Sequence, residues 1–196
     1  MHLLTISGFL GSGKTTFLIK LCKAATEKGL RVAILVNEIG EIGIDDQLMR
    51  QLDLNVWQIL DGCICCTLAK DLPGTLQKLV VDYSPDIVLL EPSGAADLEK
   101  VLSTLVYYKG APLESQKTVA LVDPLRLEKL FKVLSRLITS QIQHADMVLI
   151  NKTDIATEEE LKKSQVLLAD VRPNGNIFCI SAKHTIEHTL LAELLP

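Results

Sequence analysis

The chain has 196 residues, a length typical of one domain, and its 48% hydrophobic and 22% charged residues are typical of a globular protein with a buried core. Its net charge of −4 and its aromatic content of 4% argue against a nucleic-acid partner, which would need a basic surface and stacking side chains. The sequence also lacks the basic cluster of a membrane-surface protein and any apolar run as long as a membrane span.

Short apolar runs alternate along the chain with stretches of helical periodicity. Strands are predicted at 3–7, 32–37, 56–60, 87–91, 118–123, 147–151 and 177–181. Helices are predicted at 14–28, 69–82, 95–108, 124–143, 158–168 and 184–195. Such alternation predicts one α/β domain over residues 1–196, with a mainly parallel sheet flanked by helices on both faces. Ligands of these sheets bind at the carboxyl ends of the strands.

A glycine-rich turn joins the first predicted strand to the first predicted helix. Its sequence GFLGSGKT, at 8–15, fits the phosphate-binding pattern G-x-x-x-x-G-K-[ST] of P-loop NTPases. Lys14 is expected to bind the β- and γ-phosphate oxygens, and the Thr15 hydroxyl is expected to bind Mg²⁺. Residues expected to contact the nucleotide here are Gly8, Gly11, Ser12, Gly13, Lys14, Thr15 and Thr16. The alternative is a structural turn with chance glycines.

The segment at 38–55 has weaker periodicity and clustered acids, and we expect a mobile loop there. After it, three of the five cysteines fall within four residues, at Cys63, Cys65 and Cys66. We expect a cytoplasmic protein, because the chain starts with a predicted strand and not a signal peptide. Its cysteines then stay reduced.

Closely spaced thiolates make strained disulfides but good ligands for Zn²⁺, Cu⁺ or Ni²⁺. A tetrahedral site with three sulfurs needs one more ligand, which Glu38 or Glu41 can supply. Alternatively, the three cysteines pack beneath the glycine-rich turn as small apolar residues. Two further cysteines, inside a predicted helix and a predicted strand, are expected in the core: Cys22 and Cys179.

Three motifs follow later predicted strands. Glu91 ends the strand at 87–91, where it can hold or orient water, and Gly94 allows a backbone N–H to approach the γ-phosphate. The sequence NKTD at 151–154 predicts guanine recognition, because the carboxylate of Asp154 can accept hydrogen bonds from guanine N1–H and its exocyclic amine. Asn151 and Lys152 are expected to brace the neighbouring loops. The alternative is a polar turn that caps the next helix. Ser181 and Ala182 are expected beside the base.

Taken together, these motifs resemble the CobW-like metal-homeostasis GTPases, a group of P-loop GTPases that also includes urease and hydrogenase nickel-insertion proteins. The resemblance rests on GFLGSGKTT at 8–16, VNEIGEIGIDDQL at 36–48, DGCICC at 61–66, LLEPSG at 89–94, VD at 122–123, QIQHAD at 141–146 and NKTD at 151–154. The CxCC element is the most specific of these. The usual Asn-Glu-Phe-Gly of the family has isoleucine in place of phenylalanine, at Ile39.

The resemblance implies a GTP-dependent metallochaperone that acts on a client metalloprotein, most often with zinc and in some members with cobalt. It implies a metal site of Glu38, Glu41 and Cys65, with Cys63 and Cys66 as alternative or additional ligands. Asp45 would lie in the loop that senses the γ-phosphate and Mg²⁺. Family members usually have a C-terminal domain, which is expected to be absent here. Related GTPases dimerise on nucleotide binding, so a GTP-dependent homodimer is expected.

A slow intrinsic GTPase rate is expected, since no arginine or glutamine is evident that would polarise the water. Three alternatives remain open. One is a nickel or cobalt/corrinoid maturation GTPase, because thiolate sites accept several of these ions. Another is a P-loop kinase for a small molecule. The third is a metal-binding protein in which the nucleotide is only structural.

Overall fold

The computed structural model describes residues 1–36, 55–58, 67–173 and 175–196. In these ranges seven strands form one sheet in the order β3-β2-β4-β1-β5-β6-β7, and the paired neighbours are parallel. The strands are β1 (His2–Ser7), β2 (Val32–Val36), β3 (Asn55–Gln58), β4 (Ile87–Glu91), β5 (Ser115–Val122), β6 (Met147–Ile150) and β7 (Asn176–Cys179). The predicted α/β class with a mainly parallel sheet is confirmed.

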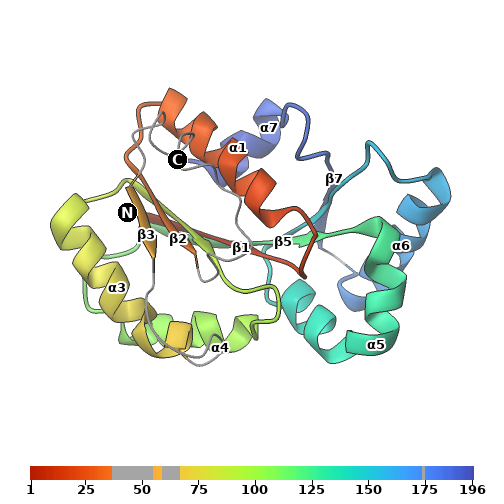
Figure 1. Cartoon of the computed structure of the whole chain (residues 1–196), viewed down its shortest axis with the longest axis horizontal. Helices are drawn as coiled ribbons and strands as arrows, with labels where there is room; N and C mark the ends of the chain where they lie inside the picture. Colours follow the sequence, from red (N-terminus) through yellow and green to blue (C-terminus); the bar gives the residue numbers. More distant parts are fainter. Residues whose placement is uncertain (37–54, 59–66, 174) are drawn as a thin grey trace.

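Helices cover both faces of this sheet. They are α1 (Lys14–Glu27), α3 (Thr67–Tyr83), α4 (Leu98–Ser103), α5 (Pro124–Gln143), α6 (Glu158–Val171) and α7 (His188–Leu194), with the 3-10 helix η1 (Thr104–Tyr107). Figure 1 shows α1 and α7 on one face, and α3, α4 and α5 on the other. The buried side chains of α5 and α6 belong to one core cluster, so α6 packs beside α5.

The core lies on both sides of the sheet because successive strand residues point to opposite faces. Along β1, Leu4 and Ile6 join the cluster that contains Phe17 of α1, whereas Leu3 joins the cluster that contains Leu76 of α3. Strands β2 and β4 are buried along their whole length. Burial on both faces explains why these strands are continuous apolar runs without polar alternation.

Strand β5 begins three residues before its predicted start. Its extra residues include Gln116 and Lys117, which are exposed but pair in register with Leu3 and Leu4 of β1. Backbone hydrogen bonds extend the strand here without any apolar signal. The predicted helix at 95–108 is also wrong in detail, since it divides into α4 and η1 and leaves residues 92–97 as a loop beside the candidate site.

The last helix begins at His188 and not at residue 184 as predicted. The N–H of His184 donates to the Ser181 carbonyl (3.0 Å) in a turn, so His184 lies before the helix. Cys22 is buried in α1 as expected, and burial raises the pKa of its thiol to about 12. The expectation for Cys179 is wrong. It ends the edge strand β7 and is exposed.

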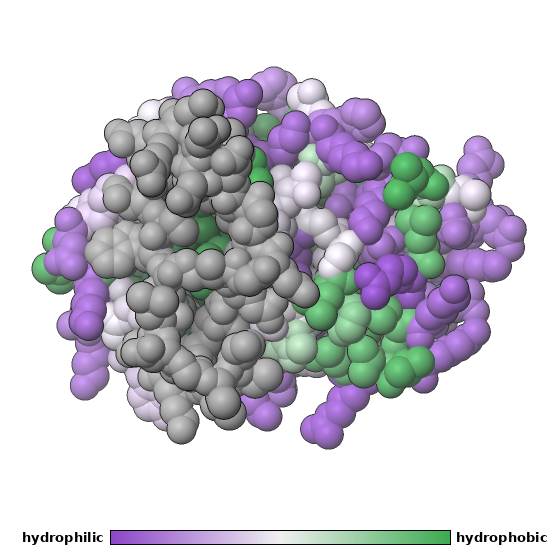
Figure 2. All heavy atoms as spheres, viewed as in Figure 1, coloured by the Kyte–Doolittle hydropathy of each residue, from purple (hydrophilic) through white to green (hydrophobic). Residues whose placement is uncertain are grey.

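The surface seen in Figure 2 is largely polar, with apolar side chains gathered around the position of α5 in Figure 1. The exposed apolar side chains of α5 include Leu125 and Val133. None of the helices in the described part of the chain is long and apolar enough to cross a membrane.

Candidate nucleotide site

The turn between β1 and α1 depends on glycine at both of its ends. Gly8 has a φ of 139° and Gly13 a φ of 96°, conformations that residues with a Cβ rarely adopt. A Cβ on Gly8 would collide with the Leu121 carbonyl, and one on Gly13 would collide with the Asn151 amide. The helix α1 starts directly after the turn. Backbone N–H groups and the positive end of the helix dipole can therefore reach a phosphate group here.

Three polar side chains meet below this turn because β1 and β4 are neighbours in the sheet. The Thr15 hydroxyl lies 3.2 Å and 3.4 Å from the two Glu91 carboxylate oxygens, to which it donates. The Lys14 ammonium lies 3.9 Å from Glu91 Oε1. Magnesium binds oxygen ligands at about 2 Å in an octahedron, so neighbouring ligands lie roughly 3 Å apart. The spacing between Thr15 and Glu91 therefore fits an Mg²⁺ ion that contacts the Thr15 hydroxyl and lies close to the Glu91 carboxylate.

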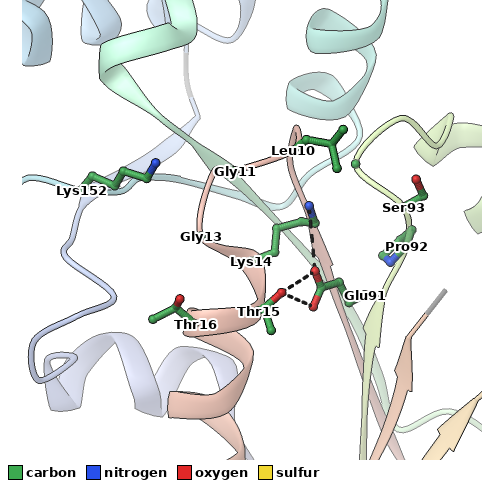
Figure 3. Close-up of a pocket in the computed structure, with 11 residues that line it drawn as sticks. Leu10, Gly11, Gly13, Lys14, Thr15, Thr16, Glu91, Pro92, Ser93 and Lys152 are labelled. Atoms are coloured by element: carbon green, nitrogen blue, oxygen red, sulfur yellow. Dashed lines mark hydrogen bonds and ion pairs between the residues drawn. The ribbon is translucent and has the colours of Figure 1, made fainter. Parts of the chain in front are cut away.

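A cavity of about 380 Å³ lies above these residues. Figure 3 shows Lys152 on one side of it and Leu10, Pro92 and Ser93 on the opposite side. Gly94 also lines the cavity, and its Cα lies so close to the P-loop that an added Cβ would be 2.7 Å from Leu10 N. The loop after β4 therefore packs directly against the tip of the phosphate-binding turn.

A second cavity, of about 200 Å³, continues from the first. The two share Gly13, Thr16 and Lys152 in their walls. The second is also lined by residues that follow β6 and β7: Asn151, Asp154, Ile155, Ser181, Ala182 and Lys183. The structure thus brings together the NKTD residues and the 181–183 loop, as predicted, and places them next to the phosphate-binding turn.

Asn151 joins the three loops around these cavities. Its side-chain amide donates to the Ser12 carbonyl (2.8 Å), and its side-chain oxygen accepts from the Ala182 N–H (2.8 Å). The side chain is buried, at 2% exposure, so both hydrogen bonds are shielded from water. Asn151 therefore fixes the positions of the phosphate-binding turn and the 181–183 loop relative to each other.

The Asp154 carboxyl group is oriented by a hydrogen bond, and its pKa is lowered. The Ser181 hydroxyl donates to its Oδ1 at 2.7 Å and lowers the pKa of the carboxyl group below its usual range, with a smaller contribution from Lys183. Lys152 has the left-handed φ of 64°, and its ammonium pairs with the buried Asp123 carboxylate at 2.7 Å. The predicted helix-cap alternative for Asp154 is wrong, since the N-cap of α6 is Thr157.

The model of the nucleotide-binding domain of CobW, HypB and UreG matches residues 2–179. The chain belongs to the CobW/HypB/UreG family.

Two curated relatives and one solved structure illustrate the match. The chain is 33% identical to the zinc chaperone YeiR of Escherichia coli (strain K12), covering 79% of this chain and 47% of YeiR. It is 24% identical to zinc-regulated GTPase metalloprotein activator 1 of Dictyostelium discoideum, covering 88% of this chain and 44% of that protein. The chain therefore spans about half the length of these relatives. The Zn(II)-bound YjiA GTPase of E. coli shares the fold with a TM-score of 0.68 at 24% identity, covering 97% of this chain and 60% of that one.

Three residues of this CobW/HypB/UreG site were not predicted from the sequence as part of it. Asp123 holds Lys152, Arg126 donates to the Leu10 carbonyl (2.9 Å) and Gln141 donates to the Gly94 carbonyl (3.1 Å). For Asp123 a signal existed, because an acid directly after a strand and before Pro124 is a typical N-cap. Arg126 and Gln141 act through backbone carbonyls of distant loops. Gln141 belongs to the QIQHAD motif, but no local pattern shows which carbonyl either side chain contacts.

The predicted metal ligands Glu38, Glu41, Cys63, Cys65 and Cys66 lie outside the described residues, as does Asp45. Among the residues that the structure does describe, no group of three or more His, Cys, Asp or Glu side chains is suited to hold a metal ion. The transition-metal site therefore stays a prediction from the sequence.

Proposed function

We propose that this chain binds Mg-GTP, hydrolyses it slowly, and couples its nucleotide state to the binding of a transition metal as a metallochaperone. The observation on which this rests most is the pair of joined cavities. The larger has the turn, lysine and carboxylate that suit a chain of phosphates, and the smaller has a carboxylate and backbone groups that suit a purine base. Their shared wall at Gly13 and Lys152 fits a ribose between base and phosphates.

Guanine selection would come from Asp154. Its carboxylate is ionised at neutral pH, where it can accept from both the N1–H and the amine of guanine. The Ser181 hydroxyl orients it and lowers its pKa below the ordinary value of 3.8. Adenine presents no donor at its N1, so an adenine nucleotide would leave the carboxylate without its partners. The Ala182 N–H is taken by Asn151, which holds the loop in place for the base.

Hydrolysis would use the residues at the other end of the site. Lys14 would contact the β- and γ-phosphate oxygens, the Thr15 hydroxyl would hold Mg²⁺, and Glu91 would orient water next to the ion. Bound Mg²⁺ supplies charge neutralisation for the phosphates. Gly94 would direct its N–H to the γ-phosphate, and Asp45 would sense it from its own loop. Positioning and electrostatics account for most of phosphoryl-transfer catalysis, which suits this set of residues.

The metal would be zinc, bound by the thiolates of Cys63, Cys65 and Cys66 with Glu38 or Glu41. Support comes from ligand chemistry and from the names of the curated relatives, which are zinc chaperones and zinc-regulated GTPase metalloprotein activators. GTP binding would change the zinc affinity, and zinc would change the GTP affinity by the same factor. We propose a client metalloprotein and a nucleotide-dependent homodimer as its partners.

The proposal is tested by nucleotide binding followed by a zinc competition titration. We expect GDP and a non-hydrolysable GTP analogue with Mg²⁺ to bind far more tightly than their adenine counterparts. Zinc affinity, measured against a chromogenic chelator, should then differ between the GDP and analogue complexes. Cys65→Ser should remove that difference, whereas Cys179→Ser, at an exposed cysteine outside the cluster, should keep it.

Equal affinity for guanine and adenine nucleotides would overturn guanine selection. Zinc affinity that does not respond to the nucleotide would overturn the coupling, and would favour a GTPase with structural cysteines. Repeating the titration with Ni²⁺ and Co²⁺ shows for which metal ion the affinity depends on the nucleotide. A nucleotide-dependent affinity for one of these ions, and not for zinc, would favour the nickel or cobalt maturation GTPase.

A further inference from the structure

Gln141 is a polar residue in an apolar position of α5. It is 3% exposed and lies between Ile138 and Ile142, whose side chains pack into the core cluster below β5 and β6. A buried amide is costly unless its donors find partners. The Gln141 Nε2 donates to the Gly94 carbonyl at 3.1 Å, a residue of the loop between β4 and α4. The side chain thus connects a core helix to the wall of the phosphate cavity.

The Gly94 side of the phosphate cavity is not shared with the base cavity. The base cavity and the phosphate cavity meet at Gly13, Thr16 and Lys152, whereas Leu10, Ser93 and Gly94 line the phosphate cavity alone. Figure 3 shows Lys152 and Ser93 on opposite sides. A nucleotide whose base lies beside Asp154 therefore extends its phosphates towards Gly94. In that arrangement the terminal phosphate of a triphosphate would reach this side of the cavity, and a diphosphate would stop before it.

We infer that Gln141 is a positioning residue that makes the site distinguish a nucleoside triphosphate from a diphosphate. By holding the Gly94 carbonyl, it fixes the peptide group that follows Gly94 and so restrains the backbone of this residue where it lines the cavity. In the proposal, the Gly94 N–H of the preceding peptide group would then be held towards the terminal phosphate. Residue 94 can contact a phosphate only through its backbone. A side chain is excluded at this position, because a Cβ on Gly94 would lie 2.7 Å from Leu10 N. The inference rests on the proposed function, since it concerns the third phosphate of the nucleotide.

The helix that carries Gln141 is well placed for this role. Leu134, between Arg126 and Gln141, has φ −128° and ψ 35°, values outside the helical range, so α5 is kinked there. Before the kink Arg126 holds the Leu10 carbonyl, and after it Gln141 holds the Gly94 carbonyl. Two segments of one helix thus hold the two loops that meet at the terminal-phosphate end.

The test measures dissociation constants for GDP and for a non-hydrolysable GTP analogue, both with Mg²⁺, in the full chain. Gln141→Met keeps the side chain's length and removes the donor, and Gln141→Glu keeps the shape and replaces the donor with an acceptor. Losing one hydrogen bond should weaken analogue binding by about threefold to tenfold in both variants. GDP binding should change by less than about twofold. Ile142→Val is the control for a small change in packing of the same helix and should leave both constants unaltered.

Thermal unfolding without nucleotide accompanies each variant. If Gln141→Met and Gln141→Glu weaken GDP and the analogue equally, or weaken neither while lowering the melting temperature, Gln141 is only a structural residue and the inference is overturned. If the wild-type chain itself binds neither nucleotide, the proposed function fails first. A wild-type chain that binds both, with an unchanged preference in the two variants, refutes the inference alone.

Discussion

The two ends of the candidate site are held by different parts of the fold. At the base end, Asn151 and Asp154 follow β6, and their partners Ala182 and Ser181 follow the neighbouring strand β7. At the terminal-phosphate end, the Leu10 and Gly94 carbonyls are held by side chains from α5, which packs on a face of the sheet. The geometry of the base end follows from strand register. The geometry of the other end depends on how α5 packs against the sheet.

This contrast suggests that the two ends would recognise different parts of the nucleotide. A sheet edge is rigid because its strands share backbone hydrogen bonds, which suits recognition of a base that is present in GDP and GTP alike. A kinked helix that is held by side-chain packing lacks such shared backbone hydrogen bonds, which would suit a region that responds to the third phosphate under the proposed function. Substitutions at the two ends should therefore have different effects on GDP and on a GTP analogue.

The largest effect is expected at the point where both nucleotides are held. Lys14→Met should lower kcat/KM for GTP by roughly 100-fold to 1,000-fold, because one preorganised cation facing the phosphates is lost. Binding of GDP should weaken as well, since the β-phosphate is also contacted. Phosphate release measures kcat/KM for GTP, and nucleotide titration measures the binding of GDP. The matched control is Lys23→Met, an exposed lysine on the same helix, which should behave as wild type. Wild-type turnover in Lys14→Met would remove this lysine from the mechanism.

The next largest effect is expected at the base end, and it distinguishes this end from the phosphate end. Asp154→Asn should weaken GDP and the GTP analogue equally, by about 30-fold, because charged hydrogen bonds to guanine are replaced by a mismatched amide. Xanthine nucleotides, which have a carbonyl in place of the amine, should bind better to the variant than to the wild type. Asp170→Asn, at an exposed position of α6, is the control. An unequal loss for GDP and analogue would contradict the separation of the two ends.

The smallest effect is expected for Ser181→Ala, and it depends on pH. The Ser181 hydroxyl lowers the pKa of Asp154 from the ordinary value of 3.8, so its removal should raise that pKa. At pH 7 the carboxylate is ionised in both proteins, and GDP should bind only about twofold to fivefold more weakly to the variant because one orienting hydrogen bond is lost. Below about pH 5 the variant becomes protonated first, so its disadvantage should grow as the pH falls. Titration of GDP between pH 7 and pH 4.5 measures this, and a constant ratio would show that Ser181 does not tune Asp154.

The elements found from the sequence are those whose signal is local. Apolar runs located β1 to β7, and spacing alone located the phosphate-binding turn and the NKTD residues around the cavities. The helices at 95–108 and 184–195 were predicted too long, because the helical pattern was extended over residues 95–97 and 184–187, which lie outside α4 and α7. Cys179 was placed in the core because an edge strand has the same local pattern as a central one.

The sequence by itself determined the α/β class, the strands, the glycines of the turn and the identity of the polar residues at the strand ends. These depend on backbone conformation and side-chain alternation, which act over a few residues. Only the tertiary structure decided which loops meet. Asn151 contacts Ser12, Arg126 contacts Leu10 and Gln141 contacts Gly94 across separations of 139, 116 and 47 residues. Such contacts follow from strand order and helix packing, which no local pattern records. For the same physical reason, the motif QIQHAD at 141–146 did not show that Gln141 contacts Gly94.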